Sequence, residues 1–218
     1  VIRPRYAFMR KRNADGSWLV KPRDVEGITE SYAELQRQLV VRDVFATVAA
    51  VRPKRGDAPE RPVKYELPDG VKIKLGDEGL DVPELLFDLR RLHADARPLL
   101  ERRAAEVPWQ SLKPVPALAY EALLACDADV RREMCQNILI TGGGSTMPGL
   151  KERLYSELCL HIPSAFKINV LAPGTTQQRS APWTGGSILA SLGSFQQLWL
   201  SAKEYAEEGA GLVERRCP

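Results

Sequence analysis

The sequence predicts an α/β protein, and three observations point to that class. Residues 63–76, VKYELPDGVKIKLG, contain two alternating runs joined around Pro68-Asp69-Gly70, which predicts a β-hairpin. An apolar run, NILIT, leads through three glycines into a stretch with helical periodicity. Residues 30–51 also repeat their apolar side chains at helical spacing. The 218 residues are enough for one large domain or two small ones.

The composition narrows the class of protein. With 44% hydrophobic residues the chain can bury a sizeable core, and a net charge of +3, from 31 basic and 28 acidic residues, gives no argument for nucleic acid. No run of 18 apolar residues predicts a membrane span. The N-terminus, VIRPRYAFMRKRN, lacks an apolar signal core and an initiator methionine, which suggests a fragment. Four cysteines without metal-ligand spacing indicate reduced thiols in a cytosolic or nuclear protein: Cys126, Cys135, Cys159 and Cys217.

The first third of the chain is expected to hold one long helix between irregular segments. Residues 1–30 are basic and interrupted by proline and glycine, which predicts a loop. A helix is expected over 30–51, with Arg37 and Arg42 on a solvated face. Its apolar positions are Leu35, Leu39, Val40, Val44 and Val48. The charged, proline-rich residues 52–62 are expected to form a link.

Two helices are expected before the glycines. Residues 81–116 are expected to be irregular, apart from a basic helical candidate, LLERRAAEV. One helix, PALAYEALLACD, is expected to begin after Pro116. A second, DADVRREMCQN, is expected to have Asp127 or Asp129 as its N-cap.

The three glycines are predicted to form a turn between a buried strand, NILIT, and the helix PGLKERLYSELCLHI, with Pro148 near the first helical turn. The apolar face of that helix is expected to consist of Leu150, Leu154, Leu158 and Ile162. Backbone N–H groups at such a turn can point at an anion, and glycines let a flat ligand approach the main chain. A plain tight turn is the open alternative. The loop lacks the lysine of a P-loop and the spacing of a Rossmann fingerprint.

The C-terminal third is expected to contain a strand, FKINVLA, then a polar loop, PGTTQQRSAP, and then helices. The helix WTGGSILASLGSFQQLWLS carries Gly185-Gly186 near its start, where glycines serve either backbone approach or close helix packing. The next stretch, SAKEYAEEG, has a capping box from Ser201 to Glu204 and ends at Gly209. His161 is expected in the last turn of the preceding long helix, where it meets the helix dipole, and carries no catalytic pattern.

Four of these stretches resemble the actin superfamily: YELPDG, NILITGGGSTMPGLKERLYSEL, APWTGGSILASLGSFQQLWLSAKEYAEEG and the RRCP terminus. The resemblance is specific over 63–88, almost continuous over 117–218, loose over 1–62 and poor over 89–116. It implies an actin-like (ribonuclease H-like) α/β fold, of which the chain holds an incomplete C-terminal lobe. LGSFQQ, VERRCP and SYAELQRQLVVRDVFATVAAV look most like the actin-related protein 4 subgroup, which comprises nuclear subunits of chromatin-remodelling and histone-acetyltransferase complexes.

Three parts follow from the resemblance. Residues 1–62 would form part of the upper inner lobe with basic insertions, and residues 63–182 the lower inner lobe. Residues 183–218 would be C-terminal helices that pack towards the outer lobe. The Asp-Gly phosphate hairpins of the actin fold have no match in these residues, nor do its Mg²⁺-side aspartates and its water-positioning glutamine. The resemblance therefore implies no catalytic residue and no metal ligand here.

The resemblance places one wall of an adenine-nucleotide cleft at the glycine turn. Gly142 and Gly143 match the glycine pair beneath the nucleotide, and Gly144 replaces a threonine. Met147 stands where actin has an aromatic residue over the adenine, and Arg179 aligns with a lysine near the adenine. The implied cofactor is ATP, with Mg²⁺ if the N-terminal half is present. A bulky side chain at Gly143 is expected to intrude on the nucleotide and to strain a backbone of positive φ.

The implied function is that of a non-enzymatic nuclear subunit that docks on a helix of a chromatin-remodelling ATPase. Nuclear actin and the nucleosome or histones are the other implied partners, and no membrane is. The surface near Trp183–Trp199 would contribute to the helix contact, although Trp199 itself is expected in the core.

Two other functions stay open. The first is a filament-forming cytoskeletal ATPase like actin, which the basic insertions argue against. The second is DNA binding by Arg10-Lys11-Arg12, Lys54-Arg55 and Arg102-Arg103, although basic residues interleaved with acids usually form a solvated loop. A salt-dependent binding slope separates DNA binding from a solvated loop.

Overall fold

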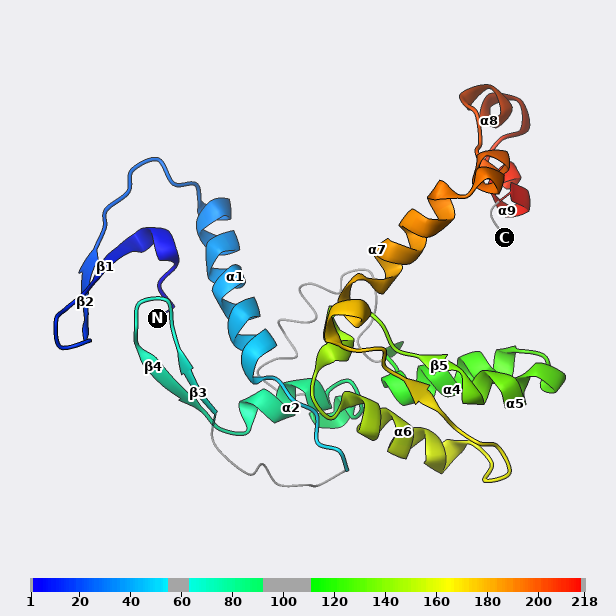
Figure 1. Cartoon of the computed structure of the whole chain (residues 1–218), viewed down its shortest axis with the longest axis horizontal. Coiled ribbons are helices and arrows are strands. Elements are labelled where there is room, and N and C mark those ends of the chain that lie inside the picture. Colours follow the sequence, from blue (N-terminus) through cyan, green and yellow to red (C-terminus); the bar gives the residue numbers. More distant parts are fainter. Residues whose placement is uncertain (1, 55–62, 92–110, 217–218) are drawn as a thin grey trace. The chain divides into compact units, whose positions relative to one another are not determined.

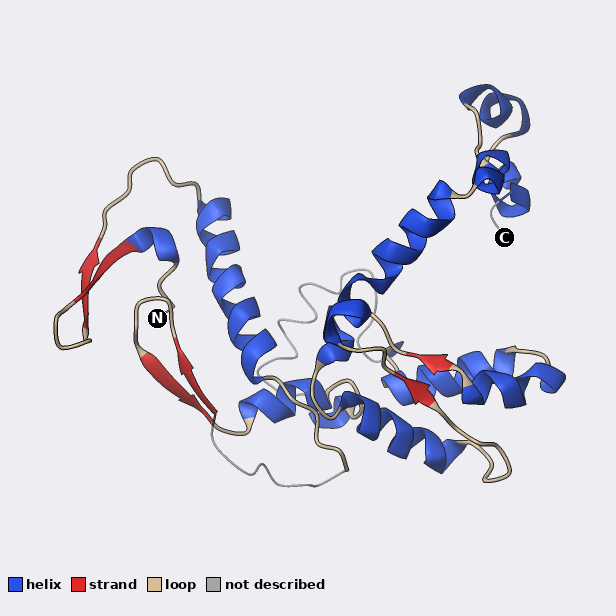
Figure 2. Ribbon diagram, in the orientation of Figure 1, coloured by secondary structure: helices blue, strands red, loops and turns tan. Residues whose placement is uncertain are grey.

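The computed structural model describes residues 2–54, 63–91 and 111–216. The fold is mixed α/β (Figure 2), and the chain divides into two compact units. Unit 1 consists of Val1–Leu139 with Met147–Leu171, and unit 2 of Ile140–Thr146 with Ala172–Pro218. The predicted helix LLERRAAEV, His93, Cys217 and most of the 52–62 link lie outside the described residues.

Helices (α), 3-10 helices (η) and strands (β) follow one another along the chain as labelled in Figure 1. In unit 1 they are η1 Arg5–Ala7, β1 Phe8–Arg12, β2 Trp18–Pro22, α1 Glu30–Val48, β3 Val63–Glu66, β4 Lys72–Leu75, α2 Glu78–Glu84, η2 Leu89–Arg91, α4 Val115–Ala125, α5 Ala128–Gln136, β5 Ile138–Leu139, α6 Leu150–His161 and β6 Val170–Leu171. In unit 2 they are η4 Gly143–Thr146, α7 Thr175–Ser191, η5 Gly193–Leu198, α8 Ala202–Glu208 and α9 Gly211–Arg216.

The N-terminal segment is a hairpin, so the prediction of a loop over residues 1–30 was wrong. β1 and β2 pair antiparallel, with Arg10 opposite Val20 and Arg12 opposite Trp18. The turn between them is held by the Asp15 carboxylate, which accepts hydrogen bonds from the Ser17 N–H at 2.9 Å and the Ser17 hydroxyl at 2.6 Å. Basic residues in strand positions hid the alternating pattern that normally identifies a strand.

The helix and hairpin predicted next are confirmed, and they pack together. α1 begins at an N-cap, Thr29, whose hydroxyl accepts the Tyr32 N–H at 3.3 Å. One face of α1 meets the β3–β4 hairpin, which pairs antiparallel as expected. The core of this contact consists of Val40, Val48, Tyr65 and Leu67.

The opposite face of α1 departs from the prediction. Leu35 and Leu39 are exposed, because the valines at 40, 44 and 48 determine which side of the helix meets the hairpin. Arg37 lies on the solvated side as predicted and pairs with Glu34 at 2.8 Å. Arg42 is exposed as well.

A buried ion pair joins α2 to α6. The Arg153 guanidinium donates from Nη2 to Glu84 Oε1 at 2.6 Å and from Nη1 to Glu84 Oε2 at 3.1 Å. Both side chains are almost fully buried, and Arg153 also lies 4.9 Å from the Phe87 ring centre. The prediction of an irregular stretch over 81–116 was wrong at its start, because residues 81–84 belong to α2. This seven-residue helix contains Pro83 and is too short to show helical periodicity.

The predicted helices α4, α5 and α6 are confirmed, and α4 packs against both α5 and α6. Leu154, Leu158 and Ile162 are buried as predicted, and Leu150 is half-buried. Asp127 is the N-cap residue of α5, although its side chain makes no capping hydrogen bond.

The strands around α6 are shorter than predicted. β5 and β6 pair parallel over two residues each. The prediction of a buried strand in NILIT was wrong, because Leu139 is 57% exposed. Among the described residues, this sheet has two strands, and so small a sheet cannot bury both faces of a strand.

In unit 2, α7 begins at Thr175, inside the stretch predicted to be a polar loop. Gly185-Gly186 consequently lies in the helix interior rather than near its start. A Cβ at either glycine would meet no atom within 4 Å, so close packing on described residues is absent there. Trp199 is 66% exposed, contrary to the prediction of a core position.

The last predicted feature of unit 2 is confirmed. α8 has the capping box, in which the Ser201 hydroxyl accepts the Glu204 N–H and the Glu204 carboxylate accepts the Ser201 N–H. The Ser201 hydrogen bonds lower the pKa of Glu204. None of the helices in the described part of the chain combines the length and apolar character that a membrane crossing requires.

Candidate functional site

The glycine turn after β5 is a tight, internally bonded loop. Gly142 has a φ of 93°, a left-handed conformation that glycine adopts without strain. Its carbonyl accepts the Ser145 N–H at 3.2 Å and the Ser145 hydroxyl at 2.8 Å. The Thr146 hydroxyl donates to the Gly143 carbonyl at 2.7 Å. The hydroxyls that follow the glycines therefore fix the shape of the turn.

A proline in α7 holds this turn in place. Pro182 has no N–H, so the carbonyl of Gln178 lacks the helical hydrogen bond it would otherwise accept from residue 182. The Gly142 N–H donates to that carbonyl instead, at 2.7 Å. A residue that costs helix stability thus creates the acceptor that anchors the glycine turn to α7.

The side chain of Gln178 adds a second anchor. It is buried, and its amide donates to the Ser145 carbonyl at 3.3 Å and to the Ser145 hydroxyl at 3.2 Å. Sequence reasoning missed Gln178 because its segment was assigned to a polar loop. The available signal was Gly174 followed by two threonines, a pattern compatible with a helix start, which the proline at 182 obscured.

The structure brings four of the five predicted nucleotide residues into unit 2. Gly142, Gly143 and Gly144 form the turn, and Arg179 follows Gln178 on α7 with an exposed side chain. Met147 is half-buried and belongs to unit 1, as the first residue after the turn. Positive φ occurs at Gly142 and not at Gly143, so the expectation of backbone strain at Gly143 was wrong.

The glycine backbone is open on its outer side. A Cβ on any of the three glycines would meet no atom within 4 Å. No described residue accepts a hydrogen bond from the N–H of Gly143 or Gly144. Accessible main chain with available N–H donors and a nearby Arg179 fits an anionic or flat ligand. In the described ranges, no three His, Cys, Asp or Glu side chains cluster in a way that could hold a metal ion.

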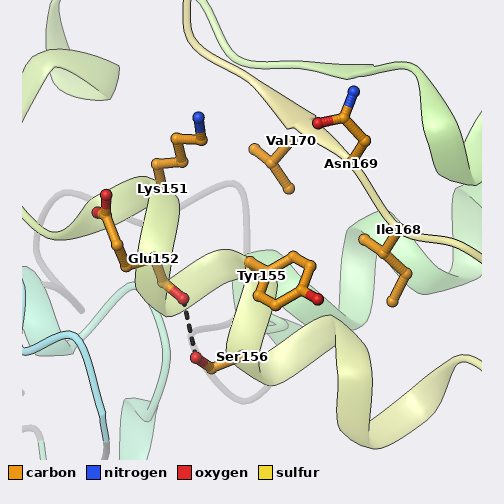
Figure 3. A pocket seen from close by; sticks show the side chains of 7 residues that line it. All are labelled: Lys151, Glu152, Tyr155, Ser156, Ile168, Asn169 and Val170. Carbon is orange, nitrogen blue, oxygen red and sulfur yellow. Dashed lines mark hydrogen bonds between the residues drawn. The ribbon is translucent and has the colours of Figure 1, made fainter.

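A cavity of about 340 Å³ lies in unit 1 between α6 and the segment leading into β6 (Figure 3). Its lining residues are Lys151, Glu152, Tyr155, Ser156, Ile168, Asn169 and Val170. Ser156 donates its hydroxyl to the Glu152 carbonyl at 2.9 Å, which leaves it without the partner base that a nucleophilic serine needs. The arrangement is that of a packing groove between a helix and a strand.

The described cysteines are free thiols, as predicted. Cys135 is buried, and its burial raises the pKa of the thiol, which keeps the reactive thiolate scarce. Cys126 and Cys159 are also unpaired. The described part of the chain therefore offers no disulfide.

Known proteins resemble this chain along its whole length. A family model described as Actin matches residues 1–218. Actin-related protein 4 of Arabidopsis thaliana is 39% identical over 222 residues, covering 100% of this chain. Actin-related protein 4 of Oryza sativa subsp. japonica is 35% identical over 227 residues, again covering 100% of the chain. The SWI/SNF and RSC complexes subunit arp42 of Schizosaccharomyces pombe is 36% identical over 201 residues, covering 88% of it.

The relatives are longer than this chain. The matches cover 49% of each actin-related protein 4 and 46% of the Schizosaccharomyces pombe subunit. The chain thus spans about half the length of the curated relatives it matches.

Proposed function

This chain belongs to the actin family, and from that premise we propose that it is part of a nuclear actin-related subunit of chromatin-remodelling or histone-acetyltransferase complexes. One observation carries the proposal: the relatives that match along the whole chain are named actin-related protein 4, and a further relative is named as a SWI/SNF and RSC subunit. The subunit acts as a scaffold without catalysis of its own, and it works in the nucleus.

The glycine turn is proposed as one wall of an ATP site. Support comes from the open backbone at Gly142–Gly144, the available N–H groups of Gly143 and Gly144, and the exposed cation of Arg179. Met147 would cover the adenine with an apolar side chain. Residues outside this chain would supply the phosphate contacts and any Mg²⁺, and the bound nucleotide stabilises the fold by mass action.

A helix of the remodelling ATPase is the proposed partner of unit 2. From α7 to η5 the chain exposes large apolar side chains at Trp183, Ile188, Leu189, Leu192, Leu198 and Trp199. An amphipathic helix docks on such a surface through apolar anchors at helical spacing. Nuclear actin and the nucleosome or histones complete the proposed partners.

Three lobe segments extend the proposal to the architecture of the full protein. Residues 1–62 belong to the upper inner lobe, 63–182 to the lower inner lobe and 183–218 to helices that pack towards the outer lobe. Limited proteolysis of the full-length protein tests the boundary at residue 62, because cleavage concentrates where few contacts cross between lobes. The boundary at residue 182 lies inside α7, so cleavage is not expected there.

Affinity capture tests the scaffold. The tagged full-length protein is expected to capture a remodelling ATPase and actin from nuclear extract, and to stay in the supernatant when centrifuged in actin-polymerising salt. Replacing Trp183 and Trp199 by serine is expected to weaken capture of the ATPase. Filaments in the pellet, or cytoskeletal partners without any chromatin subunit, would instead favour the filament-forming ATPase.

Two glycine variants test the nucleotide site. Gly143→Val places a side chain in open space without backbone strain, so it is expected to reduce ATP binding in calorimetric titration while the apo protein keeps its melting temperature. Gly185→Ala, also in open space but inside α7, is the control and is expected to bind ATP normally. Unchanged binding in Gly143→Val would assign the glycines to a plain turn.

A further inference from the structure

The strands of the two hairpins in unit 1 concentrate positive charge. The whole chain carries 31 basic and 28 acidic residues, a nearly even balance. β1, β2, β3 and β4 contain one acidic residue, Glu66. Their basic residues are Arg10, Lys11, Arg12, Lys21, Lys64, Lys72 and Lys74. Alternate strand residues face opposite sides, so Lys11 and Lys21 lie on the other face of β1–β2 from Arg10 and Arg12. The other five side chains define what we call the basic hairpin surface.

The two hairpins form one surface because they contact each other. Arg10 Nη1 donates to the Pro68 carbonyl in the β3–β4 turn at 3.1 Å. Trp18 lies against Gly70 so closely that a Cβ there would be 3.3 Å from the indole Cδ1. A cavity of about 580 Å³ is lined from both sides, by Arg12 and Trp18 of the first hairpin and by Glu66 and Lys72 of the second. The hairpins lie side by side in Figure 1.

The outer face of β3–β4 is dominated by lysines. Tyr65 and Ile73 point towards α1, so the alternate positions Lys64, Lys72 and Lys74 stand on the opposite, exposed face. Lys64 is directly opposite Lys74 in the ladder. Like charges at directly opposed positions destabilise a sheet, and no described carboxylate lies within ion-pair distance of these three lysines.

The nearby acidic side chains do little to neutralise this surface. Asp69 is buried and accepts the Val71 N–H at 3.1 Å, and Asp15 accepts from Ser17, and neither carboxylate forms an ion pair with a described lysine of this surface. Glu66 stands opposite Lys72 and is the one carboxylate that β3 and β4 contribute to the lysine face. An external polyanion would relieve the repulsion that the chain itself leaves in place.

We propose that the basic hairpin surface binds the phosphate backbone of duplex DNA. Phosphate contacts by lysine and arginine are the main source of sequence-independent affinity for DNA. Lys72 and Lys74, two residues apart on one strand, are spaced by about 7 Å, so each can contact a different phosphate. Choosing DNA over an acidic peptide rests on the proposed nuclear function.

Trp18 favours duplex over single-stranded nucleic acid. Base stacking on single strands needs a free aromatic face. The Arg10 guanidinium lies 4.2 Å from the indole centre, and Gly70 packs against the same side chain. The indole and Arg10 therefore join the hairpins, and the lysines remain to contact the backbone.

The test is fluorescence polarisation of a labelled random-sequence duplex with the full-length protein, from about 50 to about 200 mM salt. Replacing Lys64, Lys72 and Lys74 by glutamine is expected to lower the slope of log K against log salt by about one per lysine that contacts phosphate. At the middle of this salt range the affinity is expected to fall about 10-fold or more. A matched control replaces three exposed lysines elsewhere, Lys151, Lys167 and Lys203, by glutamine and is expected to bind normally.

Each outcome decides the proposal. The triple variant Lys64→Arg, Lys72→Arg and Lys74→Arg keeps the charge and is expected to bind like the wild type. Equal melting temperatures for all variants are expected to exclude misfolding. Equal loss in the control triple would mean that only net charge matters, and no binding by the wild type at low salt would overturn the proposal outright. Stronger binding of polyglutamate than of duplex, lost in the same variant, would assign the surface to an acidic protein. Capture of the remodelling ATPase is measured separately, so failure here leaves the proposed scaffold function standing.

Discussion

α6 and α7 begin in similar local settings and differ in what they bury. Each follows a glycine with positive φ, Gly149 before α6 and Gly174 before α7. In α6, Leu158 is completely buried and Arg153 reaches Glu84 in the protein interior. In α7, the large apolar side chains Trp183 and Leu189 are 77% and 58% exposed.

The difference shows that helix formation and helix burial are separate requirements. α7 forms from local hydrogen bonds and its anchor to the glycine turn, whereas α6 is surrounded by partners from its own unit. The relatives are about twice as long as this chain, and a large exposed apolar face such as that of α7 is typical of a surface that another segment or a partner covers. The predictions below test this contrast, from the largest expected effect to the smallest.

Replacing Arg153 by methionine is expected to cost about 3–5 kcal/mol of stability, because it leaves the Glu84 carboxylate buried without a counter-charge. Urea unfolding followed by circular dichroism measures the loss. The double variant with Glu84→Gln removes the stranded charge and is expected to recover part of it. An Arg153→Met protein as stable as the wild type would show that α6 is not held by this ion pair.

The same contrast can be measured by comparing one leucine on α6 with one on α7. Leu158→Ala creates a cavity beneath α6 and is expected to cost about 2–5 kcal/mol. Leu189→Ala, the matched change on α7, is expected to shift stability by less than about 0.5 kcal/mol in this chain. Comparable losses from both variants would mean that the exposed face of α7 is covered in solution.

Tyr65 provides a prediction about pH. Its hydroxyl hydrogen-bonds the Asp43 carboxylate of α1, which raises the pKa of Tyr65 to about 12. The unfolded tyrosine ionises at about 10, so the folded state favours the neutral phenol. The stabilisation is therefore fully present below about pH 10 and is lost as the pH rises towards 12. Tyr65→Phe is expected to cost about 1–2 kcal/mol at neutral pH.

The control is the difference between the two proteins across pH. The stability advantage of wild type over Tyr65→Phe is expected to shrink from pH 10 to pH 12. Lysine titration affects both proteins alike, so the change in this difference reports on Tyr65. A constant difference would mean that Asp43 does not hold the phenol neutral.

The smallest expected loss from removing a native hydrogen bond concerns unit 2, where local interactions dominate. Ser201→Ala removes the capping hydroxyl of α8 and is expected to cost about 1 kcal/mol. Hydrogen exchange of the α8 amides would report it as faster local opening, with α6 amides unchanged as the internal control. Slower or unchanged exchange in α8 would mean that other contacts determine the stability of that helix.

Patterns with one strong local cause were predictable from the sequence. The capping box at Ser201, the Pro-Asp-Gly hairpin and the apolar stripe of α6 each depend on nearby residues, and all three are confirmed. Elements that lack the usual sequence pattern of a strand or a helix were not predictable. The β1–β2 hairpin carries cations where a strand normally shows alternating apolar residues, and α7 tolerates Pro182 in its interior.

The candidate site follows the same rule. The turn could be predicted from the sequence, because three consecutive glycines indicate a backbone with unusual conformational freedom. Gln178 could not be found, since its role depends on a carbonyl left free by Pro182 and on a contact 33 residues away with Ser145. Long-range contacts of this kind leave no mark in a local pattern.

One long-range contact bears on how the protein is made. Val51 donates its N–H to the Pro148 carbonyl at 2.8 Å, and Gly149 lies so close that a Cβ there would be 2.0 Å from the Val51 carbonyl oxygen. Arg153 also bonds the Arg52 carbonyl, 101 residues earlier in the chain. At about 5–20 residues per second, a ribosome needs roughly 5–20 s to supply these partners. During that interval Val51 and Arg52 have no native contact with α6 or with the turn before it. A nascent chain halted before residue 148 therefore leaves this segment accessible to chaperones.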